Sequence, residues 1–383
     1  MIDNDRIEHL LDRYPSIADL AKRAKRRIPH FAWEYLDSGT GGETALNRNR
    51  AALDQVQLLP QFLKGDGQPD TSVELFGKRY DAPVGIAPIG MSGMLWPGSE
   101  RMLAGVARER GLAYCLSTVG CETPETVGGI AGDNAWFQLY PIADKEAEAD
   151  LLERAWDSGM RVLVVTVDVP LESIRERQRK SGLGQQGMSL KRLMRVAARP
   201  AWAIATARYG APEFRALAKY VPDAGMAQLI NYVRNQKLGV VGWAHLRKLR
   251  ELWKGRLVVK GIMTAEDARQ CVDAGADAVW VSNHGGRQFD AVPAAIDALS
   301  VIASEVGGNI PVIFDSGVRS GLDVMRAISR GADFVFAGRA FQYGPCALGQ
   351  EGAWLAAEIL LRDLRNNMTQ MGVGSIADLR ARV

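Results

Sequence analysis

The heptapeptide Ser282-Asn283-His284-Gly285-Gly286-Arg287-Gln288 places an imidazole and a guanidinium three residues apart. It follows the apolar run 278–281, which is typical of a short buried strand, so both side chains are expected on the loop that ends this strand. An imidazole takes up a proton near neutral pH, and a guanidinium fork binds a carboxylate. The pair suits the oxidation of a small acid. A solvated turn is the alternative, but two adjacent glycines favour close approach of backbone to a ligand.

Seven further apolar runs of this kind recur from residue 82 onward. Helical patterns separate most of them, for example residues 265–274 and 321–330. Strands that alternate with helices imply parallel pairing, and eight such units closing on themselves make a TIM (β/α)8 barrel. A doubly wound open sheet is the alternative, although no GxGxxG motif follows the first run. The eight predicted strands are residues 84–88, 113–117, 135–140, 162–168, 257–260, 278–282, 311–315 and 334–338.

Two stretches interrupt this alternation, and we expect residues 1–383 to form a single domain that includes both. Residues 1–80 precede the first strand, contain a helical segment at 17–38, and are predicted to cap the barrel. Residues 81–383 form the predicted barrel itself. An insertion of about residues 171–256 separates the fourth strand from the fifth, and loops of such length commonly act as lids or binding segments.

Part of this insertion is strongly basic. Between Leu183 and Tyr220 a single acid, Glu213, accompanies seven cations, a local balance of +6. With Met194 and Trp202, this stretch could lie on an anionic membrane surface; a solvated charged face is the alternative. The seven cations are Lys191, Arg192, Arg195, Arg199, Arg208, Arg215 and Lys219.

The composition is that of an ordinary globular protein, with 47% hydrophobic and 24% charged residues. A net charge of +3 gives no reason to expect nucleic acid as a partner. The four cysteines are scattered without nearby histidines, so neither a disulfide framework nor a metal site is expected. The polar N-terminus and the absence of an apolar stretch of roughly 20 residues predict a cytoplasmic protein, at most peripheral on the inner face of the membrane.

Glycine and arginine recur after the last two predicted strands, in Asp315-Ser316-Gly317-Val318-Arg319 and Ala337-Gly338-Arg339. TIM barrels commonly hold a phosphate between these two loops. Glycine exposes backbone N–H groups to the anion and arginine adds a bidentate fork. Two ordinary turns are the alternative. Because no second phosphate signature is present, a mononucleotide flavin fits better than a dinucleotide.

Lys260 ends the fifth predicted strand, which would place its ammonium inside the mouth of the barrel. A buried lysine needs negative charge nearby, and reduced flavin supplies it. The alternative is the Schiff-base lysine of an aldolase, which would leave His284 and Arg287 without a task.

These residues together resemble the FMN-dependent L-2-hydroxy-acid dehydrogenases and oxidases, a family that includes glycolate oxidase, L-lactate dehydrogenase and L-mandelate dehydrogenase. The resemblance runs from about residue 15 to about residue 375 and is most specific at 282–288. Supporting motifs lie at residues 86–88, 137–140, 166–168, 259–261 and 315–319.

The resemblance implies a role for each matching residue. The catalytic residues would be His284 as the base, Asp168 as its orienting carboxylate, Arg287, Lys260 and Tyr140. Substrate would be bound by Tyr35, Tyr140, Arg175, His284 and Arg287. The FMN cofactor would be held by Pro88, Ile89, Gly90, Ser117, Gln138, Thr166, Lys260, Ser282, Asp315, Gly317, Arg319, Gly338 and Arg339.

Three positions depart from the family pattern. Val119 stands where glycolate oxidase has tryptophan, so the pocket wall is smaller. Gly90 stands where oxidases of the family often carry alanine, which hints at an electron acceptor other than oxygen. Ser173-Ile174 replaces the more usual Gly-Arg ahead of Arg175.

The expected activity is oxidation of a lactate- or mandelate-like L-2-hydroxy acid to the 2-oxo acid, with electrons passed to a quinone or another non-oxygen acceptor. An oxidase or monooxygenase that uses oxygen is the first alternative. A non-catalytic scaffold or membrane-surface barrel and another FMN barrel, such as an isomerase, are the others. The resemblance also implies a homotetramer.

Overall fold

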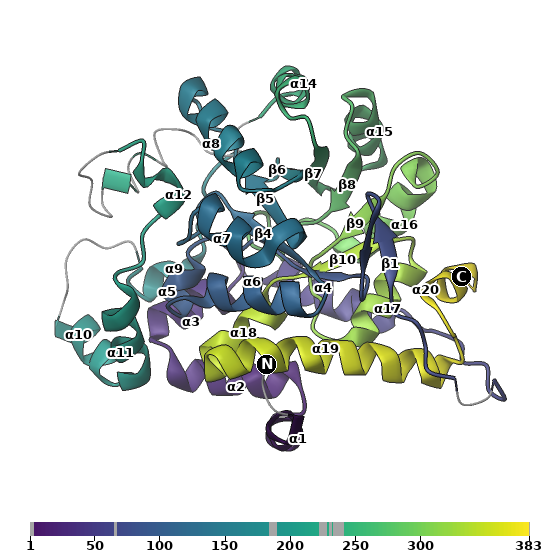
Figure 1. Ribbon diagram of the computed structural model, residues 1–383, viewed down its shortest axis with the longest axis horizontal. Coiled ribbons are helices and arrows are strands. Elements are labelled where there is room, and N and C mark those ends of the chain that lie inside the picture. Colours follow the sequence, from purple (N-terminus) through teal and green to yellow (C-terminus); the bar gives the residue numbers. More distant parts are fainter. Residues whose placement is uncertain are drawn as a thin grey trace.

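A closed barrel of eight parallel strands forms the centre of the molecule (Figure 1). The computed structural model describes residues 4–64, 67–183, 190–221, 228–229, 232 and 241–382. Each strand pairs with the next along the chain, and the last closes the ring by pairing with the first. The TIM barrel expected from the sequence is confirmed. Its strands are β3 (Val84–Ile86), β4 (Ala113–Ser117), β5 (Ala135–Leu139), β6 (Val162–Thr166), β7 (Arg256–Ile262), β8 (Ala278–Val281), β9 (Val312–Phe314) and β10 (Phe334–Ala337).

The barrel strands are buried almost throughout, because one face meets the interior and the other meets a surrounding layer of helices. Side chains of Thr123, Asp144, Thr264 and Ser320 cap the first turns of α7, α8, α15 and α17. The surrounding helices are α6 (Ser99–Glu109), α7 (Pro124–Ala131), η1 (Gly132–Asn134), α8 (Lys145–Asp157), α14 (Trp243–Leu252), α15 (Ala265–Asp273), α16 (Ala295–Val306), α17 (Gly321–Ser329) and α18 (Arg339–Leu348).

Aromatic side chains fill the interior of the barrel. Trp280 stacks on Phe336 with ring centroids 4.2 Å apart. A hairpin of β1 (Val73–Leu75) and β2 (Lys78–Tyr80), which the sequence did not predict, packs against the same interior cluster. Tyr80 of this hairpin accepts a hydrogen bond from the buried Trp136 indole at 3.1 Å. The interior is therefore a packed core where the hairpin covers it. Among the described residues, a ligand has room at the end of the barrel opposite the hairpin.

The N-terminal cap consists of α1 (Asn4–Arg13), α2 (Ile17–Arg27), α3 (His30–Asp37) and α4 (Thr44–Gln55). The prediction of one helical segment at 17–38 was wrong, because the chain breaks at Ile28, which is extended. The following Pro29 disfavours helical backbone at the residue before it. Residues from α3 and α4 contact the loops after β8 and β9, at the carboxyl ends of the strands. Residues 1–80 thus reach both ends of the barrel. Helices α3 and α4 contact the carboxyl ends of the strands, and the hairpin covers the opposite end.

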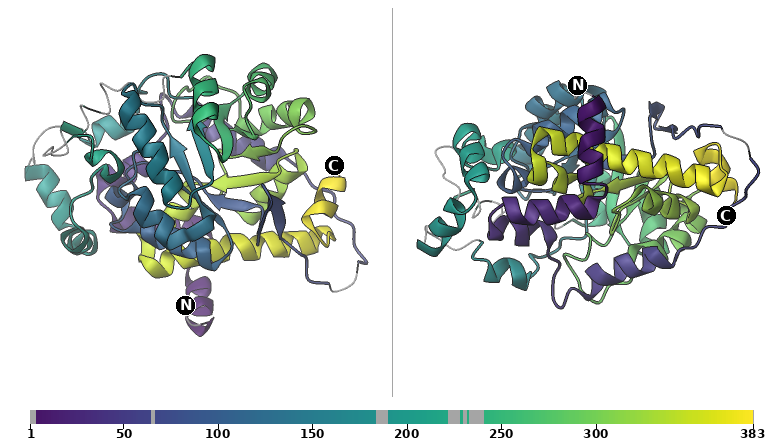
Figure 2. Two further views of the ribbon diagram at one scale, coloured as in Figure 1. Left: turned by 45° about the horizontal axis from the view of Figure 1, so that its top comes forward. Right: turned by 90° about the horizontal axis from the view of Figure 1, so that it is seen from below.

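The insertion between β6 and β7 contributes α9 (Glu176–Lys180), α10 (Leu190–Ala197), α11 (Pro200–Tyr209) and α12 (Arg215–Ala218) before α14. Both Figure 1 and the left view of Figure 2 show α10 and α11 at one side of the molecule. The expectation that Trp202 faces a membrane was wrong. Its indole is buried, lies edge-on to Phe31 and donates to the Met94 carbonyl at 3.1 Å. Trp202 anchors α11 to the body of the protein.

Two of the cations assigned to the basic surface lie close to carboxylates of the protein. Lys219 pairs with Asp150 at 2.6 Å and Arg215 lies 3.6 Å from Glu122. The side chains of Lys191 and Arg192 lie outside the described residues. Met194 is 58% exposed, so an apolar side chain does face outward from α10.

The remaining helices are α5 (Ser92–Leu95), α19 (Gln350–Met371) and α20 (Ile376–Ala381). Figure 2 shows α19 running along one side of the barrel, and it crosses α17 so closely that a Cβ on Gly321 would lie 2.0 Å from the Leu364 nitrogen. Within the described ranges, no helix is long and apolar enough to cross a bilayer.

Candidate active site

A cavity of about 1000 Å³ opens at the carboxyl ends of the barrel strands. Nearly all of the residues predicted for the site line it. The exceptions are Ser117, Asp168 and Ser282, each of which is hydrogen-bonded to a lining residue. Ser117 and Ser282 thus lie next to lining residues, and their contact with a cofactor stays a prediction. The lining members of the predicted set are Tyr35, Pro88, Ile89, Gly90, Gln138, Tyr140, Thr166, Arg175, Lys260, His284, Arg287, Asp315, Gly317, Arg319, Gly338 and Arg339.

His284 and Asp168 form a hydrogen-bonded pair, with 3.0 Å between Nδ1 and Oδ1. The His284 backbone is left-handed, with φ 57°, and its N–H donates to Ser282 Oγ at 3.1 Å. Such strain in a non-glycine residue persists only where surrounding contacts hold it. The loop after β8 thus turns the imidazole toward β6 and leaves Nε2 for the cavity.

The charges of this pair are set by opposing effects. Burial lowers the pKa of His284, and the hydrogen bond to Asp168 counters this only in part. Burial raises the pKa of Asp168, but the neighbouring His284 and Lys260 lower it by more than burial raises it, so the net shift is downward. Near neutral pH the pair is therefore a neutral imidazole beside a carboxylate, which is the state of a base ready to accept a proton.

An irregularity in β7 makes room for Asp168. The pairing register with β8 shifts between Lys260 and Ile262, and the intervening Gly261 has φ 107°. A Cβ at this position would lie 2.6 Å from the Asp168 Cβ. Only glycine allows the carboxylate to sit against the strand at this point.

Lys260 is buried at the base of the cavity and is paired there. Its Nζ lies 2.9 Å from Ser282 Oγ and 3.3 Å from Asp315 Oδ2, and Ser282 Oγ donates to Asp315 Oδ1 at 2.5 Å. Burial lowers the pKa of Lys260, but Asp315 and Asp168 raise it more, so the net shift is upward. The amine therefore stays protonated, as a fixed positive charge at the cavity floor. A Schiff-base lysine needs the opposite, an amine with a depressed pKa, so the aldolase alternative does not fit.

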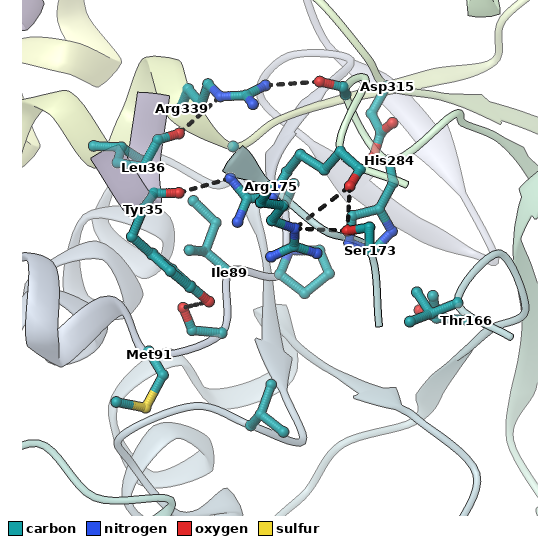
Figure 3. Close-up of a pocket in the computed structure, with 18 of the residues that line it drawn as sticks. Tyr35, Leu36, Ile89, Met91, Thr166, Ser173, Arg175, His284, Asp315 and Arg339 are labelled. Atoms are coloured by element: carbon teal, nitrogen blue, oxygen red, sulfur yellow. Dashed lines mark hydrogen bonds between the residues drawn. The ribbon is translucent and has the colours of Figure 1, made fainter. Parts of the chain in front are cut away.

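Among the arginines that line the cavity are Arg175, Arg287 and Arg339. Within the described part of the chain none of them forms an ion pair with a carboxylate. Arg287 Nη1 donates to the carbonyls of Tyr35 (2.7 Å) and Ser38 (3.2 Å). Arg339 donates to three carbonyls, including that of Leu36 at 2.8 Å (Figure 3).

The electrostatic consequence is a strong demand for an anion. Burial and the charge of Arg175 lower the pKa of Arg287 well below its usual range. Burial, together with Arg319, lowers the pKa of Arg339 to about 10. Buried charges are costly unless they are paired. A cavity with these groups unneutralised is built for ligands that carry negative charge.

The loop after β9 supplies a second anion-binding feature. Ser316 and Gly317 both have positive φ, and Ser316 Oγ accepts from the backbone N–H groups of Asn283 and Gly285. Arg50 of α4 fixes this loop by donating to the Gly317 carbonyl at 2.6 Å. Arg319 follows on the same loop and lines the cavity. This arrangement fits a phosphate, as the glycine–arginine pattern predicted.

Tyrosines and an apolar wall also line the cavity, and Tyr35 lies against Arg287, whose Cζ is 5.1 Å from the centre of the tyrosine ring. Tyr35 donates to the Gly90 carbonyl at 2.9 Å (Figure 3). Burial, with the nearby Asp168, raises the pKa of Tyr140, which stays protonated. A Cβ on Gly90 would lie 2.6 Å from Val119 Cγ2, so Gly90 and Val119 are already in contact. Met91 continues this wall.

The residues present fit FMN. Gln138 accepts from Ser117 Oγ at 2.9 Å through its Oε1, which leaves its Nε2 buried and without a partner among the described residues. A buried unsatisfied donor beside a cavity needs a ligand acceptor. With Lys260 at the floor and the Gly317–Arg319 loop at one end, the cavity offers donors for a polar ring, a charge for its reduced form and a phosphate site.

Some residues that shape the site escaped the sequence reasoning. Asn49 of α4 and Asn283 form a reciprocal amide pair, with N–O distances of 2.8 and 2.7 Å, and both are buried. The pair ties the cap to the loop that carries His284 and Arg287. Asn283 lies inside the heptapeptide, but nothing local in the sequence marks Asn49, which is 234 positions away. Chemically, the whole arrangement can hold a carboxylate next to a neutral base.

Comparison with known proteins gives a consistent result. The model of the FMN-dependent dehydrogenases matches residues 24–383. L-lactate dehydrogenase of Xanthobacter autotrophicus is 37% identical over 366 residues, covering 95% of this chain and 94% of that protein. L-lactate dehydrogenase of Alcaligenes faecalis is 36% identical over 366 residues, covering 95% and 97%.

Solved structures agree in fold over nearly the whole chain. The monotopic membrane protein (S)-mandelate dehydrogenase has a TM-score of 0.90 at 32% identity, covering 95% of this chain and 97% of that one. Mandelate oxidase has a TM-score of 0.81 at 31% identity, covering 96% and 97%.

Proposed function

Because the chain belongs to the family of FMN-dependent dehydrogenases, we propose that it oxidises a lactate- or mandelate-like L-2-hydroxy acid to the 2-oxo acid and passes the electrons to a quinone or another non-oxygen acceptor. One observation carries the proposal: buried, unneutralised arginines stand beside a neutral histidine that is hydrogen-bonded to a carboxylate. This arrangement binds an anion and removes a proton next to it.

Each group of residues has a task in this proposal. Arg287 and Arg175 bind the substrate carboxylate, and Tyr35 and Tyr140 orient the substrate by hydrogen bonds. His284 takes the proton, and Asp168 stabilises the resulting imidazolium and holds the ring orientation. FMN, when bound, accepts two electrons from the substrate.

The remaining site residues hold this cofactor. Lys260 would supply a positive charge that stabilises the negative charge of the reduced flavin. Phosphate is held by Arg319, Arg339 and the backbone near Gly317 and Gly338. The ring would be held by the backbone of Pro88, Ile89 and Gly90, with Ser117, Gln138, Thr166, Lys260 and Ser282, and Asp315 would help to hold the ribityl chain.

The apolar wall supports a substrate with an apolar side chain. Val119 and Met91 line the cavity as apolar side chains in neighbouring turns. A methyl, phenyl or branched aliphatic group can pack there, whereas a second charged group would lose its hydration without a partner.

The purified protein should be yellow, and L-lactate or L-mandelate should bleach the flavin absorbance under anaerobic conditions. The His284→Ala variant should retain FMN and reduce it at least about 10²-fold more slowly, since general base catalysis typically contributes that much. Unchanged bleaching by the variant would refute the role of His284. A colourless wild-type protein that FMN does not convert to a yellow one would favour the scaffold alternative.

Stopped-flow reoxidation distinguishes the electron acceptors. After reduction by substrate, slow reoxidation in air and fast reoxidation by a soluble quinone are expected. The reverse order would show that the oxidase alternative is correct.

We also propose that the protein is cytoplasmic and rests peripherally on the inner face of the membrane through α10 and α11. Met194 and Ile204 are exposed apolar side chains on these helices, and Arg208 is an exposed cation nearby. Co-sedimentation with anionic vesicles, lost in a Met194→Ser/Ile204→Ser variant, tests this proposal. The homotetramer implied by the resemblance stays a prediction that analytical ultracentrifugation checks.

A further inference from the structure

Arg175 lies on the segment that leads from β6 into α9, and its backbone is strained. Its φ is 41°, in the left-handed region that arginine rarely adopts. It lines the cavity from the insertion, whereas Arg287 lies in the loop after β8 and Arg339 begins α18 just after β10. A strained residue on a long loop keeps its position only if contacts on both sides hold it.

On one side of Arg175, Ser173 provides such contacts. Its Oγ lies 2.7 Å from the Arg287 carbonyl and 2.9 Å from Gln288 Oε1, and it accepts a hydrogen bond from Arg175 Nε at 3.0 Å (Figure 3). Arg175 Nη2 in turn donates to Gln288 Oε1 at 2.8 Å. The Ser173 hydroxyl thus links the guanidinium of Arg175 to the backbone of Arg287, beside a longer direct bond from Arg175 Nε to the Arg287 carbonyl at 3.4 Å. A glycine at position 173 could not make the link through the hydroxyl.

On the other side, Arg177 of α9 binds three carboxylates of the N-terminal cap. It lies 2.7 Å from Glu34, 3.0 Å from Asp37 and 3.0 Å from Glu43. Although burial lowers the pKa of Arg177, these hydrogen bonds raise it above its ordinary value. Because three acceptors surround one planar fork, lysine cannot replace it.

Asp37 also connects this cluster to the rest of the protein, since it accepts from the Tyr343 hydroxyl of α18 at 3.1 Å. Glu43 accepts from the backbone N–H of Gly39 at 2.9 Å. Asp37 and Glu43 are thus held by contacts that do not involve Arg177, so they can hold α9 in place.

We propose that Ser173 and Arg177 are positioning residues that hold Arg175 in the cavity, one from the barrel and the other from the cap. The inference rests on the proposed function in that Arg175 binds the carboxylate of the substrate. Loss of either anchor lets the strained segment relax and turns the guanidinium away, while Arg287 and the FMN site stay intact. Substrate affinity therefore falls, and FMN affinity does not.

The Ser173→Ala variant tests the first anchor. Oxalate, a small carboxylate that is not oxidised, serves as the probe in calorimetric titrations of the FMN-loaded enzyme. We expect its dissociation constant, and the KM of the hydroxy acid, to rise about tenfold, because a hydrogen bond to a charged group is lost. The limiting rate of flavin reduction should change less than about threefold.

Two comparisons separate positioning from general loosening of the segment. Ser181→Ala removes a hydroxyl from the same segment; this hydroxyl donates to the Gln178 carbonyl at 2.6 Å and bonds no arginine among the described residues, and the backbone bonds of Ser181 to Arg177 and Arg195 are kept. This variant should leave oxalate affinity unchanged. Ser173→Thr keeps the hydroxyl and should restore affinity, whereas the similarly shaped Ser173→Val should not, so this pair decides the matter even if Ser173→Ala folds poorly.

The Arg177→Gln variant tests the second anchor, with Lys180→Gln as its control. Both remove one positive charge from α9, but Lys180 is exposed and has no partner among the described residues. We expect Arg177→Gln to weaken oxalate binding roughly tenfold, since charge-assisted bonds to the cap are lost. Lys180→Gln should bind oxalate like the wild type.

The outcomes can be told apart from failure of the proposed function. Wild-type oxalate affinity in Ser173→Val or in Arg177→Gln would overturn the inference for that anchor, as would equal losses in either control. A wild-type enzyme that binds no oxalate would overturn it entirely. Oxalate binding without any flavin reduction by 2-hydroxy acids would instead count against the proposed function alone.

Discussion

At the scale of the residue, the site depends on charges whose neighbours pull in opposite directions. Burial keeps His284 neutral and Asp168 opposes that effect, while the same contact, with Lys260, keeps Asp168 ionised. The other oxygen of Asp168, Oδ2, is buried and has no partner among the described residues. The electrostatic attraction between Asp168 and His284 is therefore strongest when the imidazole is protonated, which is its state after it has taken the proton of the substrate.

Asp168→Asn should slow flavin reduction by about 10² to 10⁴-fold, because the imidazolium loses its stabilising charge. Asp168 raises the pKa of His284, so its removal should move the acid limb of the pH–rate profile to lower pH. In the wild type this limb should already be displaced toward lower pH, since burial lowers the pKa of His284. Stopped-flow reduction at several pH values measures both effects, and an unchanged limb would contradict the pairing.

At the scale of the element, the site is a meeting of loops that close contacts hold in place. The turn after β3 and the turn after β4 touch at Gly90 and Val119, and Met91 N–H donates to the Val119 carbonyl at 2.8 Å. A side chain at position 90 and the present one at position 119 cannot both occupy this space. The two turns therefore set the wall of the cavity jointly.

Gly90→Ala should weaken FMN binding and lower the thermal midpoint, because its Cβ would lie 2.6 Å from Val119 Cγ2. Val119→Ala removes that methyl group and should restore most of the loss when combined with Gly90→Ala. The double-mutant cycle should show a coupling of about 1 kcal/mol or more. Additive effects of the two substitutions would indicate that the turns adjust independently.

The sequence predicted the elements better than their contacts. Periodic apolar runs located all eight strands, since burial on both faces leaves a continuous local signal. The break at Ile28 was missed, although Pro29 marks it, because the amphipathic pattern continues across it. Trp202 was assigned to the surface because an aromatic residue in a basic stretch has the same local pattern whether its helix turns inward or outward.

At the scale of the whole molecule, one buried carboxyl couples global stability to pH. Glu100 is 1% exposed and accepts hydrogen bonds from Ser92 Oγ at 2.8 Å and from the Cys121 N–H at 2.6 Å. Burial raises its pKa from 4.5 to about 7, in spite of these bonds. Since the folded state holds the proton more tightly, this group favours folding below pH 4.5, and that contribution is lost as the pH rises through about 7.

Glu100→Gln should remove this pH dependence. The difference between the two pKa values corresponds to roughly 3 kcal/mol, at about 1.4 kcal/mol per pH unit. Relative to the wild type, the variant should therefore gain stability between pH 5 and pH 8, as measured by thermal midpoints. Glu125→Gln is the control, because the pKa of Glu125 is lowered to about 2 and its contribution does not change in this range. A constant difference between Glu100→Gln and wild type would contradict the shift.

The sequence by itself determined the order of strands and helices, the heptapeptide with His284 and Arg287, and the glycine–arginine loops, because each is written in adjacent residues. Only the tertiary structure decided that Asn49 pairs with Asn283, that Arg177 binds three carboxylates of the cap, that Ser117 and Ser282 bond to lining residues, and that Ser173 joins two arginines. Those contacts link segments more than 100 positions apart in most cases, as for Ser173 and Arg287, which differ by 114. They depend on the closed barrel and on the cap packed over its mouth, because local propensity does not specify which distant groups meet.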